Sequence, residues 1–173
     1  MADLTFNTTA GETVKRELLI AFLNTAPQSE PVWFPLGKRV EESSAEYDWG
    51  AETKTDVLGR SYTNLKKPTV TQTFEPGELD SSDEAQVKIW NLAVREQNYV
   101  ALANQDILIV HFYAGSKDSP FAERYSACTV QPTALGGEGG GNVGMPVDIT
   151  YGGVRTIGTA TNTDGVVTFT PAD

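Results

Sequence analysis

Histidine and cysteine are nearly absent from this 173-residue chain, which has one of each, His111 and Cys128. A single cysteine cannot form a disulfide within the chain, so the composition fits a reducing compartment. These two residues are also too few for most hydrolytic and metal chemistry, which needs several bases or ligands. The composition therefore disfavours an enzyme, and we expect no catalytic residue, no cofactor and no bound metal.

Positive charge is also scarce, because 13 Lys and Arg stand against 23 Asp and Glu, for a formal net charge of -10. Tight binding of DNA or RNA is disfavoured, since cations govern the affinity for phosphates. The acidic excess either keeps the surface soluble or lets it stay near nucleic acid without adhering. Long apolar runs are missing as well, and residues 1–12 lack a basic segment before an apolar one. We therefore predict neither a signal peptide nor a membrane segment.

The length suits one domain, and 39% hydrophobic residues are enough to form a core. Runs rich in Thr, Val, Ile, Tyr and Gly surround one strong helical pattern, which predicts a mainly β fold with a single helix. We expect one domain over residues 1–173, with a long loop at about 41–67 and a Gly-rich loop at 136–144.

Alternation of apolar and polar residues locates the strands. Segment 18–23 is apolar on both sides, which predicts a strand with both faces covered, although a short helix is an alternative. Segment 69–74 alternates threonine with larger residues, and segment 106–114 is the clearest strand of the chain. Other strands are expected at 32–36, as an edge strand or turn because of its prolines, at 121–130, at 147–151, and as a terminal hairpin at 154–161 and 166–170.

The helix is expected to begin with a capping box, in which Ser81 accepts from the amide of Glu84 and Glu84 reaches back. Val87, Trp90 and Val94 follow at helical spacing on one face. We predict that this face packs against a sheet, with Trp90 as its anchor.

Three further features look chemical but favour structural interpretations. His111 lies in mid-strand among apolar neighbours with no partner suggested nearby, and Cys128 resembles a small buried hydrophobe. Gly139, Gly141 and Gly144 formally match G-x-G-x-x-G. That fingerprint must follow a strand and open a helix, whereas a proline and a strand follow here, so we predict a flexible loop and no nucleotide site.

The polar segment 41–67 carries isolated aromatic residues, namely Tyr47, Trp49 and Tyr62. Loops of this length are uncommon in compact domains and are usually functional or disordered. Exposed Tyr and Trp on such a loop would suit an interface. The alternative is that these rings fold back onto their own core.

The order of these features resembles the major tail tube protein of long-tailed, siphophage-type bacteriophages. The resemblance is carried by Pro31-Val32-Trp33 with Leu36-Gly37, by the long loop before the strand 67–75, by the single helix and the strand 107–113, and by segment 148–158 after the glycine loop. No single motif is diagnostic, and the family has no catalytic signature to compare.

The resemblance implies a β-sandwich or partial barrel with one α-helix packed on the outside. Such subunits form hexameric rings that stack into a tube, through which DNA passes without tight binding. The implied partners are further copies of the chain and other tail proteins. The implied location is the virion, after synthesis in the host bacterial cytoplasm, and a prophage or tail-derived bacteriocin fits equally. The candidate contact residues between subunits are Trp33, Tyr47, Trp49, Leu58 and Tyr62.

A second hypothesis is a monomeric β-sandwich binding module of the carbohydrate-binding or adhesin type. It would use Trp33, Trp49 and Tyr62 as stacking faces. Assembly discriminates between the two hypotheses, because a tube protein forms rings or polymers and a binding module stays monomeric.

Overall fold

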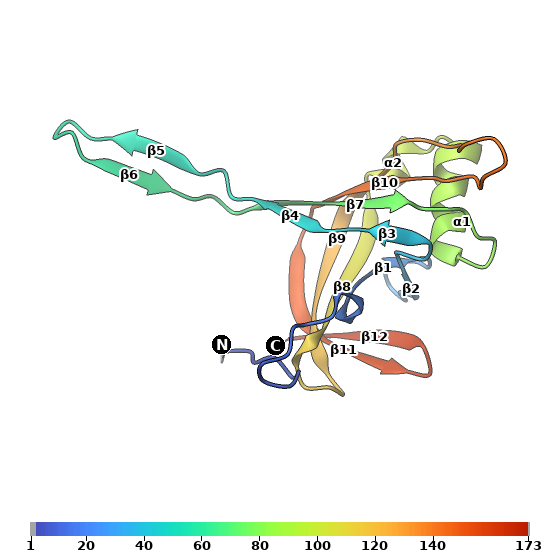
Figure 1. Ribbon diagram of the computed structural model, residues 1–173, viewed down its shortest axis with the longest axis horizontal. Coiled ribbons are helices and arrows are strands. Elements are labelled where there is room, and N and C mark those ends of the chain that lie inside the picture. The colour runs from blue at the N-terminus through green and yellow to red at the C-terminus, as the bar shows by residue number, and fades with distance from the viewer. Residues whose placement is uncertain (1–2, 173) are drawn as a thin grey trace.

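Strands make up most of the regular structure in this computed structural model, which describes residues 3–172. The fold is mainly β, a curled half-barrel sheet with one 12-residue helix over residues 84–95, whose second part is π-helical (Figure 1). This confirms the predicted fold class. The strands are β1 (Leu19–Asn24), β2 (Trp33–Pro35), β3 (Val40–Glu42), β4 (Ala45–Asp48), β5 (Glu52–Thr55), β6 (Ser61–Asn64), β7 (Thr69–Pro76), β8 (Gln105–Gly115), β9 (Pro120–Pro132), β10 (Val147–Tyr151), β11 (Arg155–Thr163) and β12 (Val166–Pro171). The helical segments are η1 (Arg16–Leu18), α1 (Glu84–Trp90), the π-helical η2 (Asn91–Arg95) and α2 (Tyr99–Leu102).

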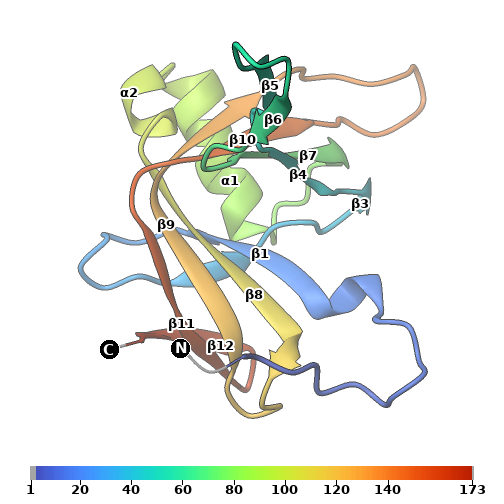
Figure 2. The ribbon, with the colours of Figure 1, turned by 90° about the vertical axis from the view of Figure 1, so that its left-hand side faces the viewer.

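The main sheet forks along β9. One edge of β9 pairs with β8, while the other edge pairs with β11 over residues 121–125 and with β10 over residues 129–132. One branch continues from β11 to β12, and the other continues from β10 through β7 to β3 and β4. On the far side, β8 pairs with β1, and β1 pairs with β2. Figure 2 shows the two branches diverging, with β10 and β7 above and β11 and β12 below.

Two glycines let the chain cross from β10 to β11 at this fork. A Cβ on Gly152 would lie 2.6 Å from the carbonyl oxygen of Ala127, and one on Gly153 would lie 2.8 Å from the Ala127 Cβ. Gly153 also has a φ of +68°, which side chains with a Cβ rarely adopt. Because the crossing passes so close to β9, only glycine fits there, and Arg155 is then placed opposite Tyr125.

Two hydrophobic cores lie on opposite faces of the central strands. Strand β8 contributes Ile107 and Ile109 to the first core, and Leu108 and Val110 to the second. The first core is completed by β7, β10 and α1, and the second by β2, β11 and β12. Burial on both faces explains why β8 is the clearest strand in the sequence, as β-branched and apolar residues follow each other without interruption.

The predicted faces of two other strands are also confirmed. In β1, Leu23 belongs to the first core and Phe22 to the second, so both faces are covered as expected. In β7, burial alternates strictly, with the threonines exposed and Val70, Gln72 and Phe74 buried. β2 pairs only with β1 and is the edge strand that its prolines indicate.

The predicted capping box is wrong. The helix begins at Glu84, and its cap is Asp83, whose carboxylate accepts from the Gln86 amide at 3.0 Å. The preceding residues form a turn of their own, in which Asp80 accepts from both the amide and the hydroxyl of Ser82. The turn ends at Asp83, whose amide donates to the carbonyl of Asp80 at 3.0 Å, so the helix starts two residues later than the serine predicts.

The predicted buried face of the helix is wrong in part. Ala85 and Ile89 are buried, whereas Val87 is 42% exposed and Val94 is 38% exposed. Trp90 is half-buried and packs against the first core, so its role as an anchor is retained. The π-helical turn at 91–95 adds a residue to the turn, which rotates Val94 away from the face that a regular helix would give it.

The predicted long loop at 41–67 consists mainly of strands. β3 and β4 pair with β7, while β5 and β6 pair with each other and project far from the rest of the molecule (Figure 1). All residues of β5 and β6 are exposed. Because neither face of this hairpin is buried, its sequence carries no apolar alternation that would reveal it.

The Gly-rich segment is a loop, as predicted, and it is closed at its base. The backbones of Gly136 and Gly144 exchange two hydrogen bonds, of 3.1 and 2.7 Å. The terminal hairpin is also present, and its turn holds only Asp164 and Gly165, both with positive φ, as a type I′ turn requires. None of the helices within residues 3–172 has the length and apolarity needed to cross a membrane.

Candidate functional site

The projecting hairpin, residues 49–66, is called the arm, and local hydrogen bonds shape its tip, residues 56–60. The carboxylate of Asp56 accepts from the amides of Leu58 and Arg60, at 2.8 and 2.9 Å, and Gly59 supplies a positive φ. Val57 is fully exposed and Leu58 is 71% exposed. The tip is therefore an ordered turn that holds two apolar side chains in water, which is a feature of an interaction site.

The base of the arm is fixed to the body by a second set of local contacts. The Lys66 amide donates to the carbonyl of Trp49 at 2.9 Å, and Asp48 accepts from the amide of Gly50. At ~3.3 Å per residue, the arm reaches roughly 25 Å beyond this point. No other part of the described chain supports it, so its strands are held by pairing and by cross-strand contacts such as that between the Thr53 and Thr63 hydroxyls.

The structure separates Trp33 from the other predicted contact residues. Tyr47, Trp49 and Tyr62 are each about half exposed along the arm and its root, and the rings of Tyr47 and Trp49 stack at 6.2 Å. Leu58 is at the tip, so these four are available to a partner.

Trp33 is only 5% exposed and belongs to the second core. The guanidinium of Arg124 lies 5.6 Å from its ring and also binds Asp106 through two hydrogen bonds. Because the second core and Arg124 surround the indole, Trp33 is not part of the accessible surface of the subunit.

Several further apolar residues are exposed that the sequence patterns did not indicate. Val57 and Leu65 flank the contacts predicted on the arm, and Leu4 and Phe6 stand out from the N-terminal segment. Phe6 packs edge-on against Tyr113, so this segment is attached to the end of β8. The signal for Val57 and Leu65 was present, since apolar residues in a polar hairpin have no core to enter.

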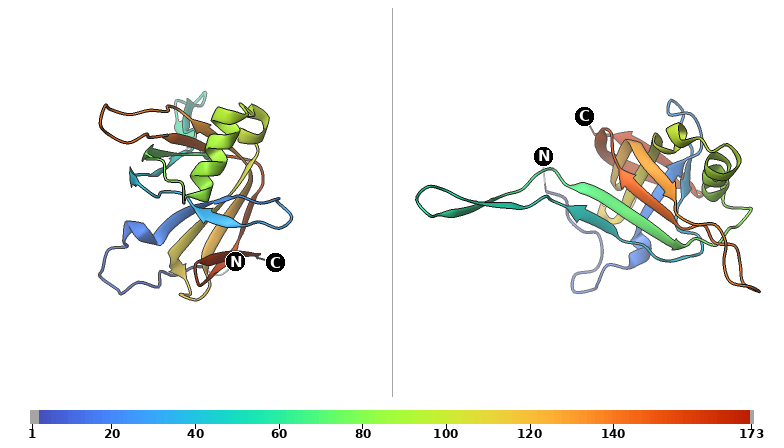
Figure 3. Two further views of the ribbon diagram at one scale, coloured as in Figure 1. Left: turned by 90° about the vertical axis from the view of Figure 1, so that its right-hand side faces the viewer. Right: turned by 90° about the horizontal axis from the view of Figure 1, so that it is seen from above.

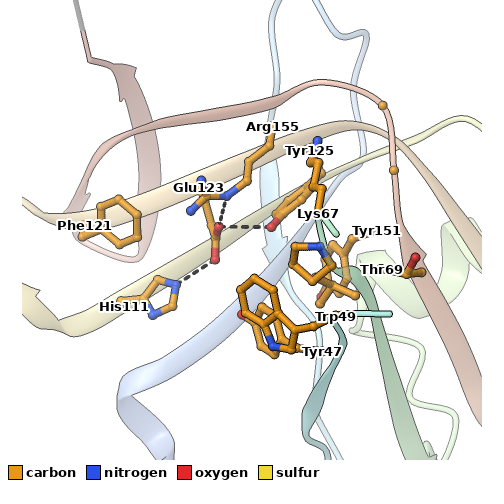
Figure 4. A pocket seen from close by; sticks show the side chains of 14 residues that line it. Tyr47, Trp49, Lys67, Thr69, His111, Phe121, Glu123, Tyr125, Tyr151 and Arg155 are labelled. Carbon is orange, nitrogen blue, oxygen red and sulfur yellow. Dashed lines mark hydrogen bonds and ion pairs between the residues drawn. The ribbon is translucent and has the colours of Figure 1, made fainter. Parts of the chain in front are cut away.

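A hollow of about 620 Å³ lies between the root of the arm and β9, and we call it the inner hollow. Figure 4 shows Glu123 at its centre, facing side chains from three strands. Its carboxylate lies 3.0 Å from His111 Nε2 and 2.6 Å from Arg155 Nε, and it accepts from the Tyr125 hydroxyl at 3.1 Å. Tyr47 and other aromatic rings line the walls.

The charge of Glu123 is stabilised by these neighbours. Burial raises the pKa of its carboxyl, but hydrogen bonds and charges from His111 and Arg155 lower it further, so the net pKa lies below its ordinary value. Burial, followed by the charge of Glu123, raises the pKa of Tyr125. The carboxylate is therefore ionised at neutral pH, and Tyr125 remains a hydrogen-bond donor to it.

These contacts correct the interpretation that His111 has no nearby partner. Glu123 pairs in register with Ile109, which makes it a diagonal neighbour of His111 across β8 and β9. A glutamate between Phe121 and Tyr125 on an apolar face was the sequence signal for this cluster. Both carboxylate oxygens already accept from protein donors, so the cluster joins three strands rather than exposing an acid or a base.

Cys128 is buried, as predicted, and burial raises the pKa of its thiol to about 12. A thiol in this state is neither a nucleophile nor a metal ligand at neutral pH. Within residues 3–172, no group of three or more His, Cys, Asp or Glu side chains is placed to hold a metal ion.

One face of the branch formed by β4, β7, β10 and the end of β9 is polar and carries only negative charge. Cross-strand register aligns Glu46 with Thr71, Thr71 with Thr150, and Thr150 with Thr129. Two residues further along β7, Thr73 pairs with Asp148 and its hydroxyl donates to the Asp148 carboxylate at 2.8 Å. We call this surface the polar face; its residues are Glu46, Asp48, Thr69, Thr71, Thr73, Glu75, Thr129, Gln131, Asp148 and Thr150.

The sequence matches no protein-family model and no curated protein sequence. Several solved structures share its general shape. A chain of the sheath–tube complex of an extracellular contractile injection system is 8% identical with a TM-score of 0.44, covering 87% of this chain and 94% of that one. The anti-feeding prophage cap, which terminates a tube, is 13% identical with a TM-score of 0.46, covering 89% and 96%. A chain of the anti-feeding prophage baseplate is 11% identical with a TM-score of 0.47, covering 87% and 97%. At these sequence identities and TM-scores, this chain is similar to those proteins in overall outline, and the similarity does not assign it a function.

Proposed function

We propose that this chain is the structural subunit of a tail-tube-like conduit, in which copies join edge to edge into rings and the rings stack. The observation that carries the proposal is the branch bearing the polar face. Its outer strand β4 pairs only with β7, and at the other side the pairing of β8 ends at Cys128, so residues 129–132 pair with β10 alone. Unpaired edges favour continuation of the sheet into another copy.

Closing such sheets into a ring would give a barrel whose wall is the polar face. Threonine hydroxyls and carboxylates would line the interior, and the four charged members are Glu46, Asp48, Glu75 and Asp148. Like charge repels phosphate, so a DNA duplex would pass without adhering. This gives the acidic composition a specific purpose. We take six copies per ring from the resemblance of the sequence to tail tube proteins.

The arm suits the stacking of rings. It extends beyond the body, and its apolar tip has no partner within the described residues. The partners would be further copies of the chain, other tail proteins at the ends of the tube, and DNA in transit. The particle would be a virion or a tail-derived injection particle, made in the host bacterial cytoplasm.

Assembly tests the proposal directly. We expect light scattering at rising protein concentration, followed by negative-stain microscopy, to show rings or tubes with a central channel. A species that stays monomeric at high concentration, with or without purified tail components as nuclei, would contradict the proposal.

The lumen assignment has its own test, because a cation on the inner wall would hold DNA. We expect assembled Glu46→Lys to retain duplex DNA at low salt, whereas Asp118→Lys, the same charge change in the exposed turn before β9, would not. Retention that is equal in the two variants would contradict the assignment of the polar face to the lumen.

The second candidate function is a monomeric binding module. The observation that favours it is the inner hollow, whose walls include Tyr47, Trp49 and Tyr151 with Arg155 at one side. The burial of Trp33 removes one of the three stacking faces that the sequence suggested. Quenching of tryptophan fluorescence by a panel of oligosaccharides, lost in Trp49→Ala, would support this function for a chain that does not assemble.

A further inference from the structure

The arm and its base carry cations that form no ion pair. Six exposed Lys and Arg side chains within residues 3–172 lack an ion pair; Arg60, Lys66 and Lys67 lie on the arm or next to its base, while Arg16, Arg95 and Lys117 lie elsewhere. The tip that carries Arg60 also carries Val57 and Leu58, both strongly exposed.

Carboxylates that form no ion pair lie at the far end of β7, the strand that follows the arm in the chain. A hollow of about 970 Å³, which we call the end hollow, opens between β3, the end of β7 and the Gly-rich loop. Glu41, Glu42 and Glu75 line it, are exposed, and form no ion pair among the described residues. Leu135, which is 48% exposed, adds an apolar wall.

The arm and the end hollow are connected by one continuous strand path. β6 leads from the tip back to the body, β7 starts at Thr69 directly after the arm, and β7 ends at Glu75 and Pro76 in the end hollow. Figure 1 and the right panel of Figure 3 show the arm at one end of the longest axis and the Gly-rich loop at the other. A second copy displaced along this line therefore brings its tip toward the end hollow of the first.

We propose that the tip of one copy docks in the end hollow of the next copy, head to tail. In this contact Val57 and Leu58 cover Leu135, and Arg60 faces Glu42 and Glu75. The contact joins different surfaces of the two copies, so it repeats without closing and builds a filament along the arm. This inference rests on the proposed function and names the acceptor of the arm, which the assembly of rings does not specify.

Disulfide trapping between copies tests the docking. We expect oxidised Leu58→Cys/Leu135→Cys protein to give a ladder of covalent multimers, and a mixture of the two single variants to give a covalent dimer. The matched control is Leu58→Cys/Val166→Cys, because Val166 is 66% exposed but lies on the terminal hairpin, away from this line. The native Cys128 has no exposed surface and should not react.

Charge reversal gives an independent measure. Arg60→Glu should raise the protein concentration needed for assembly by roughly fivefold, because it removes one exposed ion pair between copies. Combining it with Glu42→Lys and Glu75→Lys should restore assembly. An undiminished defect in the combined variant would overturn the pairing.

Microscopy of the same samples separates this inference from the proposed function. Tubes without a covalent ladder would overturn the docking and leave the tube assignment intact. A ladder without tubes would support the docking and contradict the conduit. Monomers without a ladder would overturn both.

Discussion

The body and the arm of this subunit are held together by different forces. In the body, central strands are buried on both faces, and each face belongs to a separate apolar core. In the arm, every strand residue is exposed, and the structure depends on backbone pairing and on the Asp56 turn. An isolated two-stranded hairpin is only marginally stable in water. The body is therefore stabilised by burial on both faces of its strands, whereas the arm is stabilised only by its own hydrogen bonds.

Removing the arm should have the largest effect on assembly and little effect on folding. Deletion of residues 52–64 joins Ala51 to Leu65 and leaves a short loop next to Gly50, between Trp49 and Lys66, whose backbones are already hydrogen-bonded. We expect an unchanged circular dichroism spectrum and rings that do not stack under the microscope. The substitutions Val57→Ser and Leu58→Ser, which keep the hairpin, should weaken stacking in the same direction. Normal tubes from the deletion variant would show that the arm does not stack rings.

Truncation of a single side chain in the body should instead have a large effect on folding stability. Leu108 has no exposed surface in the second core, so Leu108→Ala should lower the free energy of unfolding by about 2–5 kcal/mol. Leu58→Ala at the tip deletes the same atoms, but there they are exposed to water in the folded subunit. It should therefore change the free energy of unfolding by less than about 0.5 kcal/mol. Urea denaturation monitored by tryptophan fluorescence measures both. Equal losses would mean that the tip is packed in the free subunit.

The inner hollow lies where arm and body meet, and Glu123 at its centre should stabilise the contact between β8, β9 and β11 in a pH-dependent way. Its pKa is lowered in the folded state, so its stabilising contribution is present above the ordinary carboxyl pKa and is lost as pH falls through the folded value. Glu123→Gln should cost about 2 kcal/mol at neutral pH, because charged hydrogen bonds to His111 and Arg155 are lost. Denaturation series from neutral to acidic pH should show this difference shrinking below about pH 4.5. A difference that stays constant with pH would contradict the charged network.

The smallest effect concerns the start of the helix. Asp83→Ala removes the cap and should cost about 1 kcal/mol, while Ser81→Ala should be nearly neutral. Thermal unfolding of the two variants compares them under one condition. A larger loss from the serine substitution would restore the capping box that the sequence suggested.

Where a segment is buried, the sequence identified it, as β1, β7 and β8 show. The alternation in segment 69–74 predicted which side chains enter the core, and the structure confirms each of them. The arm gave no such signal, because its residues are polar on both faces. The helix face was misjudged for a related reason, since spacing alone does not reveal a π-helical turn or the earlier turn at Asp80.

The exposure of the candidate contact residues, and not their role, can be compared with the structure. Tyr47, Trp49, Leu58 and Tyr62 are accessible, and Trp33 is not, because Arg124 and Asp106 enclose it in the second core. The cluster around Glu123 was missed altogether. Its members come from three strands, so only their pairing register brings them within hydrogen-bond distance.

The sequence by itself determined the mainly β class, the single helix, the acidic balance, the scarcity of reactive side chains and the faces of the buried strands, since these follow from composition and from local periodicity. Only the tertiary structure decided the fork at β9, the projection of the arm, the continuous polar face and the end hollow on the line of β7. These depend on which strands pair and in what register, which is set by packing between residues far apart in the chain, and no local pattern records it.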